Sequence, residues 1–314
     1  MFTGIMTVYR THVETGAGKV NPTNAINPSS YSRAEPETAF GYPRDFLDNR
    51  FVYAVVSPRA KGLSLGVNMN PDKKCNFDCP YCEVNRQEPP RETRLNVKVM
   101  AVELMKTLRM VYDGRLRQQP RYRKLPDELM RLHHVTLSGD GEPTLAQNFS
   151  EVVEAVTHVR AQGAFPFFKI VLVTNATGLD KPEVLEGLKL LDPADEIWAK
   201  LDGGSQAYLN AVNRPDVLIE KILDNILLVA RRRPVVIQSL FPSINDVEPS
   251  AEEIARYVQR LADLKAKGAQ ISHVQIYSAT RPMPQAGCGH LRLKDLSNIA
   301  RLLRTATGLR AEVF

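Results

Sequence analysis

The chain has 314 residues, of which 43% are hydrophobic and 24% are charged, and it carries a formal net charge of +6. These proportions are those of a globular protein and exclude a disordered or fibrous chain. No apolar run reaches the roughly 18 residues needed to cross a bilayer, and the first residues lack the apolar stretch of a secretory signal. We therefore expect a cytoplasmic protein without a membrane partner, in which the four cysteines do not indicate a disulfide framework.

Residues 1–56 predict an irregular N-terminal extension, because Asn, Pro, Ser, Thr and Gly are frequent there and no apolar period persists. Residues 57–314 predict the core domain, because short apolar runs alternate with longer amphipathic ones. The expected strands cover residues 63–69, 133–137, 169–173, 196–201, 235–240 and 273–277. The expected helices cover residues 95–112, 148–162, 182–190, 215–231, 251–267 and 293–305.

Six strands that are each followed by a helix predict an α/β fold, a partial (β/α)6 barrel. In such barrels the catalytic groups lie on the loops that follow the carboxyl ends of the strands. Polar residues directly after each expected strand are therefore the candidates for the site.

Three cysteines, Cys75, Cys79 and Cys82, follow the first expected strand at a C-x3-C-x2-C spacing. Three thiolates that hold a four-iron cube leave one iron without a protein ligand, and an open metal position is where chemistry takes place. The alternative is a zinc site completed by Cys288 or His290, although zinc sites usually show two C-x2-C pairs. The single triplet favours the cluster.

This spacing, with the aromatic Tyr81 before the last cysteine, resembles the signature of the radical S-adenosylmethionine (SAM) superfamily. The resemblance implies a partial six-unit barrel, a [4Fe-4S] cluster on the three cysteines, and SAM as the second cofactor. It also implies an external one-electron donor such as flavodoxin or ferredoxin.

The segment LSGDGEPTL follows the second expected strand and contains Gly139, Asp140, Gly141 and Glu142. It resembles the glycine-rich motif of this superfamily that binds the methionine amino group of SAM, with Asp140 in place of the commoner glycine. Glycines there permit a close backbone approach. A tight turn without a binding role is the alternative interpretation.

Polar residues also end the later strands and reach the same rim, which in a barrel brings them to one pocket. The resemblance implies that this rim contacts the ribose and carboxylate of SAM, and a flat Tyr side chain suits adenine. Gln238 and Gln275 have a second interpretation as core amides. The candidates for cofactor binding are Asn175, Lys200, Asp202, Gln238 and Tyr277.

The motifs SGDGEPTL, AKLDGG, AVNRPD and VQIYSATRP resemble the group that includes the tRNA wyosine-base synthases. Those enzymes carry a second cysteine triplet upstream, whereas this chain has no cysteine before Cys75. We therefore expect radical SAM chemistry on another substrate, with a wyosine-type tRNA modification and a zinc-stabilised nucleic-acid-binding module as alternatives.

Basic residues give a second indication about the substrate. Two clusters, residues 115–124 and 231–233, precede strands and are expected on the face opposite the catalytic mouth. Basic residues at the mouth would suit an anionic small molecule or RNA. These are Lys73, Lys74, Arg86, Arg91, Arg94, Arg214 and Arg281.

Overall fold

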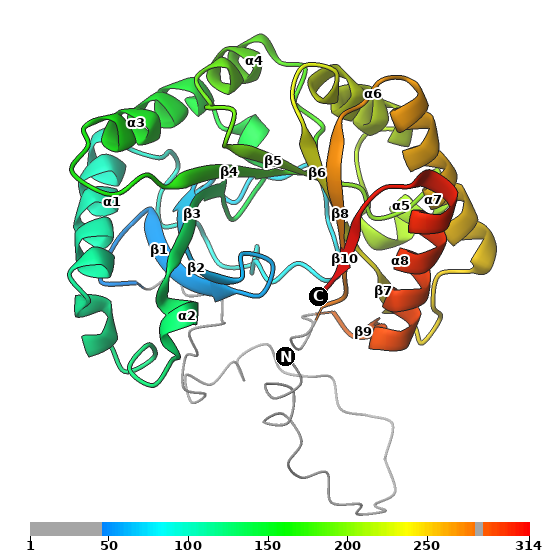
Figure 1. Ribbon diagram of the computed structural model, residues 1–314, viewed down its shortest axis with the longest axis horizontal. Coiled ribbons are helices and arrows are strands. Elements are labelled where there is room, and N and C mark those ends of the chain that lie inside the picture. The colour runs from blue at the N-terminus through cyan, green and yellow to red at the C-terminus, as the bar shows by residue number, and fades with distance from the viewer. Residues whose placement is uncertain (1–45, 280–284) are drawn as a thin grey trace, which may run out of the picture. The chain divides into compact units, whose positions relative to one another are not determined.

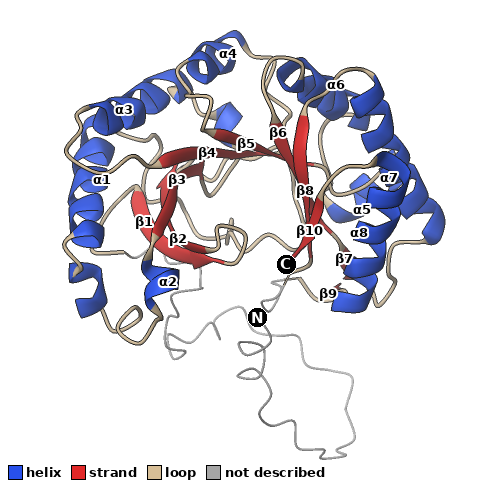
Figure 2. Cartoon of the chain, viewed as in Figure 1, coloured by secondary structure: helices blue, strands red, loops and turns tan. Residues whose placement is uncertain are grey.

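The structure is a computed structural model that describes residues 46–279 and 285–314, all within one compact unit, Glu37–Phe314. Residues 1–45 of the predicted extension and Arg281 lie outside the described residues. An eight-stranded sheet curves through this unit, and the helices cover its convex side (Figures 1 and 2). This arrangement confirms the predicted partial barrel.

The sheet has the order β1-β2-β3-β4-β5-β6-β8-β10. All neighbouring strands are parallel except β1, which pairs antiparallel with β2. The six predicted strands are confirmed as β2, β3, β4, β5, β6 and β8. The strands are β1 (Val52–Ser57), β2 (Gly62–Asn68), β3 (Leu132–Ser138), β4 (Lys169–Thr174), β5 (Glu196–Lys200), β6 (Val235–Leu240), β8 (Ile271–Tyr277) and β10 (Ala311–Val313).

The six predicted helices are present within a few residues of their expected bounds, and each buries an apolar face. Local capping explains some of their starts: Ser250 accepts a hydrogen bond from the amide of Glu253 at the start of α7. The helices are α1 (Val97–Tyr112), α2 (Asp127–Met130), α3 (Phe149–Ala161), α4 (Pro182–Lys189), α5 (Gln206–Val212), α6 (Ile219–Ala230), α7 (Ala251–Ala266) and α8 (Leu293–Thr307).

The last residues of the predicted extension belong to the sheet. β1 lies within residues 46–57, and its side chains alternate between buried and half-buried positions. Phe46 and Phe51 are buried in the core. The carboxylate of Glu103 on α1 accepts hydrogen bonds from the backbone amides of Arg50, Phe51 and Val52, at 2.7 to 3.1 Å. The prediction of an irregular segment up to residue 56 was therefore wrong for residues 52–56, because the local sequence does not show these long-range contacts.

Three further elements were not predicted. β10 adds a parallel strand beyond β8 after the last helix, and two short strands, β7 (Pro242–Ile244) and β9 (Cys288–His290), pair antiparallel outside the main sheet. α5 was not predicted either, because the helix expected over residues 215–231 corresponds to α6 alone.

The concave side of the sheet has a small apolar layer of its own, formed by Val171, Trp198 and Val236. His134 meets Trp198 edge to face, with the ring centroids 5.3 Å apart. Above this layer, toward the carboxyl ends of the strands, the side chains become polar, and the candidate site lies there.

Candidate active site

The segment that follows β2 and carries Cys75, Cys79 and Cys82 is called the cysteine loop. Its first contact is with the glycine-rich segment after β3. The amide of Glu142 donates to the carbonyl oxygen of Lys74 at 2.9 Å. A β-carbon at Gly141 would lie 1.8 Å from that same oxygen, so only glycine fits. The structure therefore places the glycine-rich segment directly against the cysteine loop.

The residues directly after β4 form the second contact with the cysteine loop. Asn175 donates to the side-chain oxygen of Asn76 at 2.9 Å, and its amide nitrogen lies 4.0 Å from the sulfur of Cys75. Thr177 also bonds Asn76. Asn175 thus lies at the predicted rim, where it orients the residue next to a cysteine.

The turn after α5 forms the third contact. The amide of Asp78 donates to the carbonyl oxygen of Asn213 at 2.9 Å, and the amide of Asp216 donates to that of Asn76 at 3.2 Å. Arg214, which takes a left-handed backbone conformation with φ of 46°, lies 3.3 Å from the carboxylate of Asp78. Three separate segments of the barrel rim therefore fix one loop.

All three cysteines of the loop are free thiols with a nearby donor. The amide of Phe77 lies 3.4 Å from the sulfur of Cys75, Asn213 donates to Cys79 at 3.4 Å, and Arg86 lies 3.8 Å from Cys82. Burial raises the pKa of Cys75 to about 12 and that of Cys79 to about 11. These thiols are protonated at neutral pH unless a metal replaces the proton.

The zinc alternative finds no complete ligand set. Within residues 46–279 and 285–314, no three Cys, His, Asp or Glu side chains are close enough to hold a single metal ion. Cys288 lies in β9, apart from the triplet in the sequence. Three separated thiols on one loop fit a larger cluster better than a mononuclear site.

Glu142 is buried, and both carboxylate oxygens are occupied by the protein. One oxygen accepts from the hydroxyl and amide of Thr144 and from the hydroxyl of Thr174, and the other accepts from the amide of Asn175 at 2.7 Å. The carboxylate therefore joins the exits of β3 and β4. Its side chain thus holds the rim, and the contact with SAM expected from the sequence stays a prediction.

Beside Glu142, one buried acceptor has no partner. The side-chain oxygen of Asn70 has no hydrogen-bond partner among the described residues, and this residue is 2% exposed. Its β-carbon is close to Gly141. An unsatisfied buried acceptor at the glycine-rich segment fits an ammonium group, such as the amino group of a methionine moiety.

Tyr81 and Asp202 meet on the β5 side of the mouth. The phenol of Tyr81 donates to the Asp202 carboxylate, whose other oxygen accepts from the amide of Leu240 at 2.8 Å. Burial, with the charge of Asp202, raises the pKa of Tyr81 well above its usual value. Tyr81 therefore stays protonated and acts as a hydrogen-bond donor.

Lys200 completes this group. Its ammonium lies 3.3 Å from Asp202 and 3.5 Å from the hydroxyl of Tyr277. Burial, the largest single influence, lowers the pKa of Lys200, but Asp202 together with Tyr277 and Cys79 outweighs burial and raises the pKa. The guanidinium of Arg59 stacks on the Tyr277 ring, 4.1 Å from its centre. Tyr277 thus lies between two cations at the mouth.

Gln238 lies deeper and is bonded within the protein. Its amide donates to the side-chain oxygen of Gln275 at 2.9 Å, and both residues are buried. Of the two interpretations that the sequence left open for these glutamines, the core amide pair is the one that this geometry supports.

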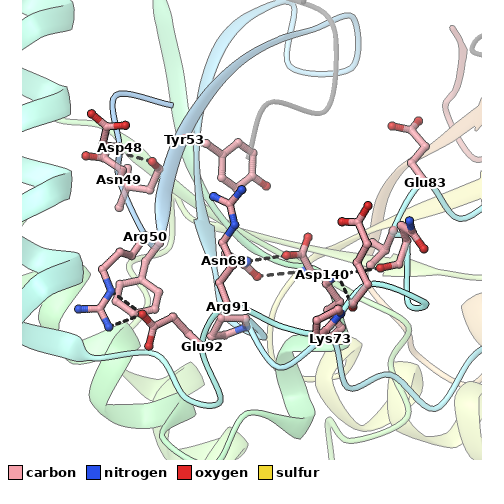
Figure 3. A pocket seen from close by; sticks show the side chains of 17 residues that line it. Asp48, Asn49, Arg50, Tyr53, Asn68, Lys73, Glu83, Arg91, Glu92 and Asp140 are labelled. Atoms are coloured by element: carbon pink, nitrogen blue, oxygen red, sulfur yellow. Dashed lines mark hydrogen bonds and ion pairs between the residues drawn. The ribbon is translucent and has the colours of Figure 1, made fainter. Parts of the chain in front are cut away.

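A cavity of about 780 Å³ opens beside the glycine-rich segment (Figure 3). Asp140 lies on its lining next to Asn68, which accepts from the Asp140 amide at 3.0 Å and donates to its carboxylate at 2.8 Å. Burial raises the pKa of Asp140 to about 7. Arg50 and Glu92 also line the cavity, and the side chain of Arg50 donates a hydrogen bond to the carboxylate of Glu92 at 2.7 Å. Gly139 packs beneath, where a β-carbon would lie 2.7 Å from Asn68.

The basic residues at the mouth are mostly engaged. Lys73 donates to the backbone oxygens of Asn85 and Glu88, and acidic side chains pair with Lys74, Arg86, Arg94 and Arg214. Arg91 also has an interaction partner within the protein. The cavity wall also carries five carboxylates against three cations, so the mouth supports an anionic substrate less than the sequence suggested.

Sequence reasoning missed Asn213, Asn70, Asn76 and Arg59. Asn70 and Asn76 lie beside Cys75 in the sequence, whereas Arg59 and Asn213 reach the site from other segments. The polar run AVNRPD, which the resemblance had singled out as a motif, was the signal for Asn213. No helix in the described part of the chain is long and apolar enough to span a membrane.

The fold and the cysteine loop together define a class of enzyme. The model of the radical SAM superfamily matches residues 69–252, and the chain belongs to this superfamily. Membership implies SAM and an iron-sulfur cluster as its cofactors.

Individual relatives agree with this assignment. A UPF0026 protein of Synechocystis sp. is 29% identical over 237 residues, which are 74% of this chain and 77% of that protein. A radical SAM methyltransferase from Sphaerobacter thermophilus is similar in fold, with a TM-score of 0.57 and 15% identity over 84% of this chain and 68% of that one. TYW1 with a lysine-pyruvate adduct bound has a TM-score of 0.51 and 14% identity, over 78% and 74% of the two chains.

Proposed function

We propose that this enzyme holds a [4Fe-4S] cluster on Cys75, Cys79 and Cys82 and uses it to cleave SAM reductively. The observation that carries the proposal is the cysteine loop, which three segments of the barrel rim fix while all three thiols remain free. Cys75, Cys79 and Cys82 would hold the cluster, which would supply the electron for reductive cleavage of SAM to a 5'-deoxyadenosyl radical that can abstract hydrogen from a substrate.

The chain's own residues bind and orient SAM. Asn70 and the backbone of Gly139–Gly141 accept the methionine amino group, because the oxygen of Asn70 is otherwise unsatisfied. Tyr277, which lies between Arg59 and Lys200, offers a flat partner for the adenine. Asp202 keeps Lys200 charged, so Lys200 contributes a cation at the mouth.

The substrate occupies the cavity beside Asp140, which is large enough for a molecule of ordinary metabolite size. The abstracting radical would form next to the glycine-rich segment that lines it. An external one-electron donor such as flavodoxin or ferredoxin reduces the enzyme.

Anaerobic reconstitution with iron and sulfide, followed by dithionite and SAM, tests the proposal. We expect about four irons per chain and release of 5'-deoxyadenosine and methionine. Cys75→Ala, Cys79→Ala and Cys82→Ala should each lose the cluster, and Cys288→Ala is the matched control that keeps it. A colourless protein that binds one zinc per chain would contradict the proposal.

A further inference from the structure

Asn213 connects the cysteine loop to the β5 side of the mouth. It is 1% exposed and follows the last residue of α5. Its side-chain amide is shared among the hydroxyl of Tyr81 at 2.6 Å, the carboxylate of Asp202 at 2.7 Å and the sulfur of Cys79 at 3.4 Å. Its backbone oxygen accepts the amide of Asp78, next to the same cysteine.

The partners of this amide determine its orientation. An amide nitrogen has two hydrogens, and Asp202 is a buried carboxylate held by Leu240 and Lys200. A charged acceptor fixes the donor more firmly than a neutral one. The nitrogen is therefore held at the cysteine sulfur by a group that does not itself touch the sulfur.

A hydrogen bond to a ligating sulfur withdraws electron density and favours the reduced form of an iron-sulfur cluster. The other two cysteines have more distant side-chain donors, at 4.0 Å for Cys75 and 3.8 Å for Cys82, and Cys75 receives its closer bond from the backbone amide of Phe77. The Cys79 sulfur thus receives the shortest side-chain hydrogen bond of the three.

We propose that Asn213 is a positioning residue that sets the reduction potential of the cluster through the Cys79 sulfur and links this sulfur to Asp202 and Tyr81. The inference rests on the proposed function, because it requires a cluster on the triplet. It assigns a role to the AVNRPD segment, which none of the cofactor assignments explained.

The test is an EPR-monitored reductive titration of the anaerobically reconstituted protein without SAM. Asn213→Leu keeps the side-chain volume and removes the donor. Asn148→Leu is the matched control: Asn148 is equally buried and donates to the carbonyl oxygen of Leu95 at 2.9 Å, with no contact to the cysteine loop. We expect a more negative midpoint potential in Asn213→Leu and the wild-type value in Asn148→Leu, at equal iron content.

Asn213→Ser keeps the protein testable if the leucine variant does not fold, because a serine hydroxyl is too short to reach the sulfur, and the same negative shift is expected. In the metal-free protein, hydrogen exchange at residues 78–81 should be faster in either variant than in the wild type. Loss of the cluster from both folded Asn213 variants would contradict the proposal, because Asn213 would then be needed for assembly and not for the potential.

A full cluster at the wild-type potential, in both Asn213 variants, overturns the inference and leaves the proposed function intact. A wild-type protein that assembles no four-iron cluster refutes the proposed function instead. In that case the exchange measurement on the metal-free protein still reports whether Asn213 orders the loop.

Discussion

At the scale of single residues, two buried side chains at the glycine-rich segment differ in whether their oxygen atoms have hydrogen-bond partners. Glu142 is surrounded by donors from three residues, whereas the buried oxygen of Asn70 has no partner among the described residues. The first holds the exits of β3 and β4 together, and we propose that the second accepts a ligand. Mutations at the two positions should therefore have separable effects.

Glu142→Gln places an amide where the carboxylate accepts several hydrogen bonds, so at least one buried donor loses its acceptor. We expect the free energy of unfolding to fall by about 1–3 kcal/mol. Urea denaturation of the metal-free protein measures it. Unchanged stability together with weaker SAM binding would restore a direct contact between Glu142 and SAM.

Asn70→Leu removes the unsatisfied acceptor and keeps a similar volume. SAM binding should weaken by about 1–3 kcal/mol, while the iron content and the melting temperature remain near the wild-type values. Calorimetry with the reconstituted, oxidised protein gives the affinity. Equal affinity for SAM would remove Asn70 from the binding site.

At the scale of elements, the parallel strands bury polar groups on their concave side as well as apolar ones. His134 on β3 packs against Trp198 on β5 and is 5% exposed. Burial lowers the pKa of His134 to about 4; the charge of Glu196 opposes this shift, and His133 and Lys169 act in its direction. The folded barrel therefore keeps this imidazole neutral.

This gives a pH dependence whose sign is fixed. The unfolded chain binds a proton at His134 near pH 6.5, whereas the folded chain does so only near pH 4, so stability falls as the pH drops between these values. From neutral pH to pH 5 the loss from this group is about 2 kcal/mol. His134→Phe keeps the ring contact with Trp198. It should reduce the fall in the free energy of unfolding between neutral pH and pH 5 by that amount. A profile parallel to that of the wild type in chemical denaturation would contradict the prediction.

The elements also show what a single sequence can reveal. The six barrel strands were predictable because each is a run of apolar residues followed by turn residues. β1 was not, because it follows a segment rich in Asn, Pro and Ser, and it depends on Glu103 about 50 residues away to bond its backbone amides. α5 was missed because it is only seven residues long and ends at the backbone turn formed by Asn213 and Arg214.

The same distinction applies to the candidate site. The cysteine triplet could be read from its spacing, and Gly141 from its motif. The use of Glu142 as a brace and of Asn213 as a donor depends on where distant residues lie, such as Thr174 beside the first and Asp202 beside the second. Local sequence carries residue type but not these partners.

At the scale of the whole molecule, the chain combines a fold like that of TYW1 with a single cysteine triplet. The basic clusters lie where expected, before β3 and β6 on the side of the sheet away from the cysteine loop. Several of their residues serve the fold, because Arg233 donates to the carbonyl oxygens of Asp192 and Asp195 and Arg117 to that of Leu125. These two arginines thus have a structural role, which is the simpler explanation of their place in the clusters.

We therefore expect no condensation of pyruvate with N1-methylguanosine tRNA. The reduced enzyme, incubated with SAM, pyruvate and methylated tRNA, should release 5'-deoxyadenosine and leave the tRNA base unchanged. Digestion of the RNA and mass spectrometry detect a tricyclic nucleoside if it forms. Its formation over many turnovers would assign the enzyme a wyosine-type activity, and a reaction without tRNA is the control.

The high pKa values of Cys75 and Cys79 make cluster assembly an exchange of protons for iron. Each of these buried thiols must release a proton to solvent before its sulfur can bind a metal, so a more acidic medium opposes loading and a more alkaline one favours it. Acid should therefore strip the cluster at a pH where the chain itself remains folded. Proton uptake in a weakly buffered solution while a chelator removes the iron, corrected for the protons that released sulfide binds and the chelator releases, would count these protons, with two expected per chain from this pair.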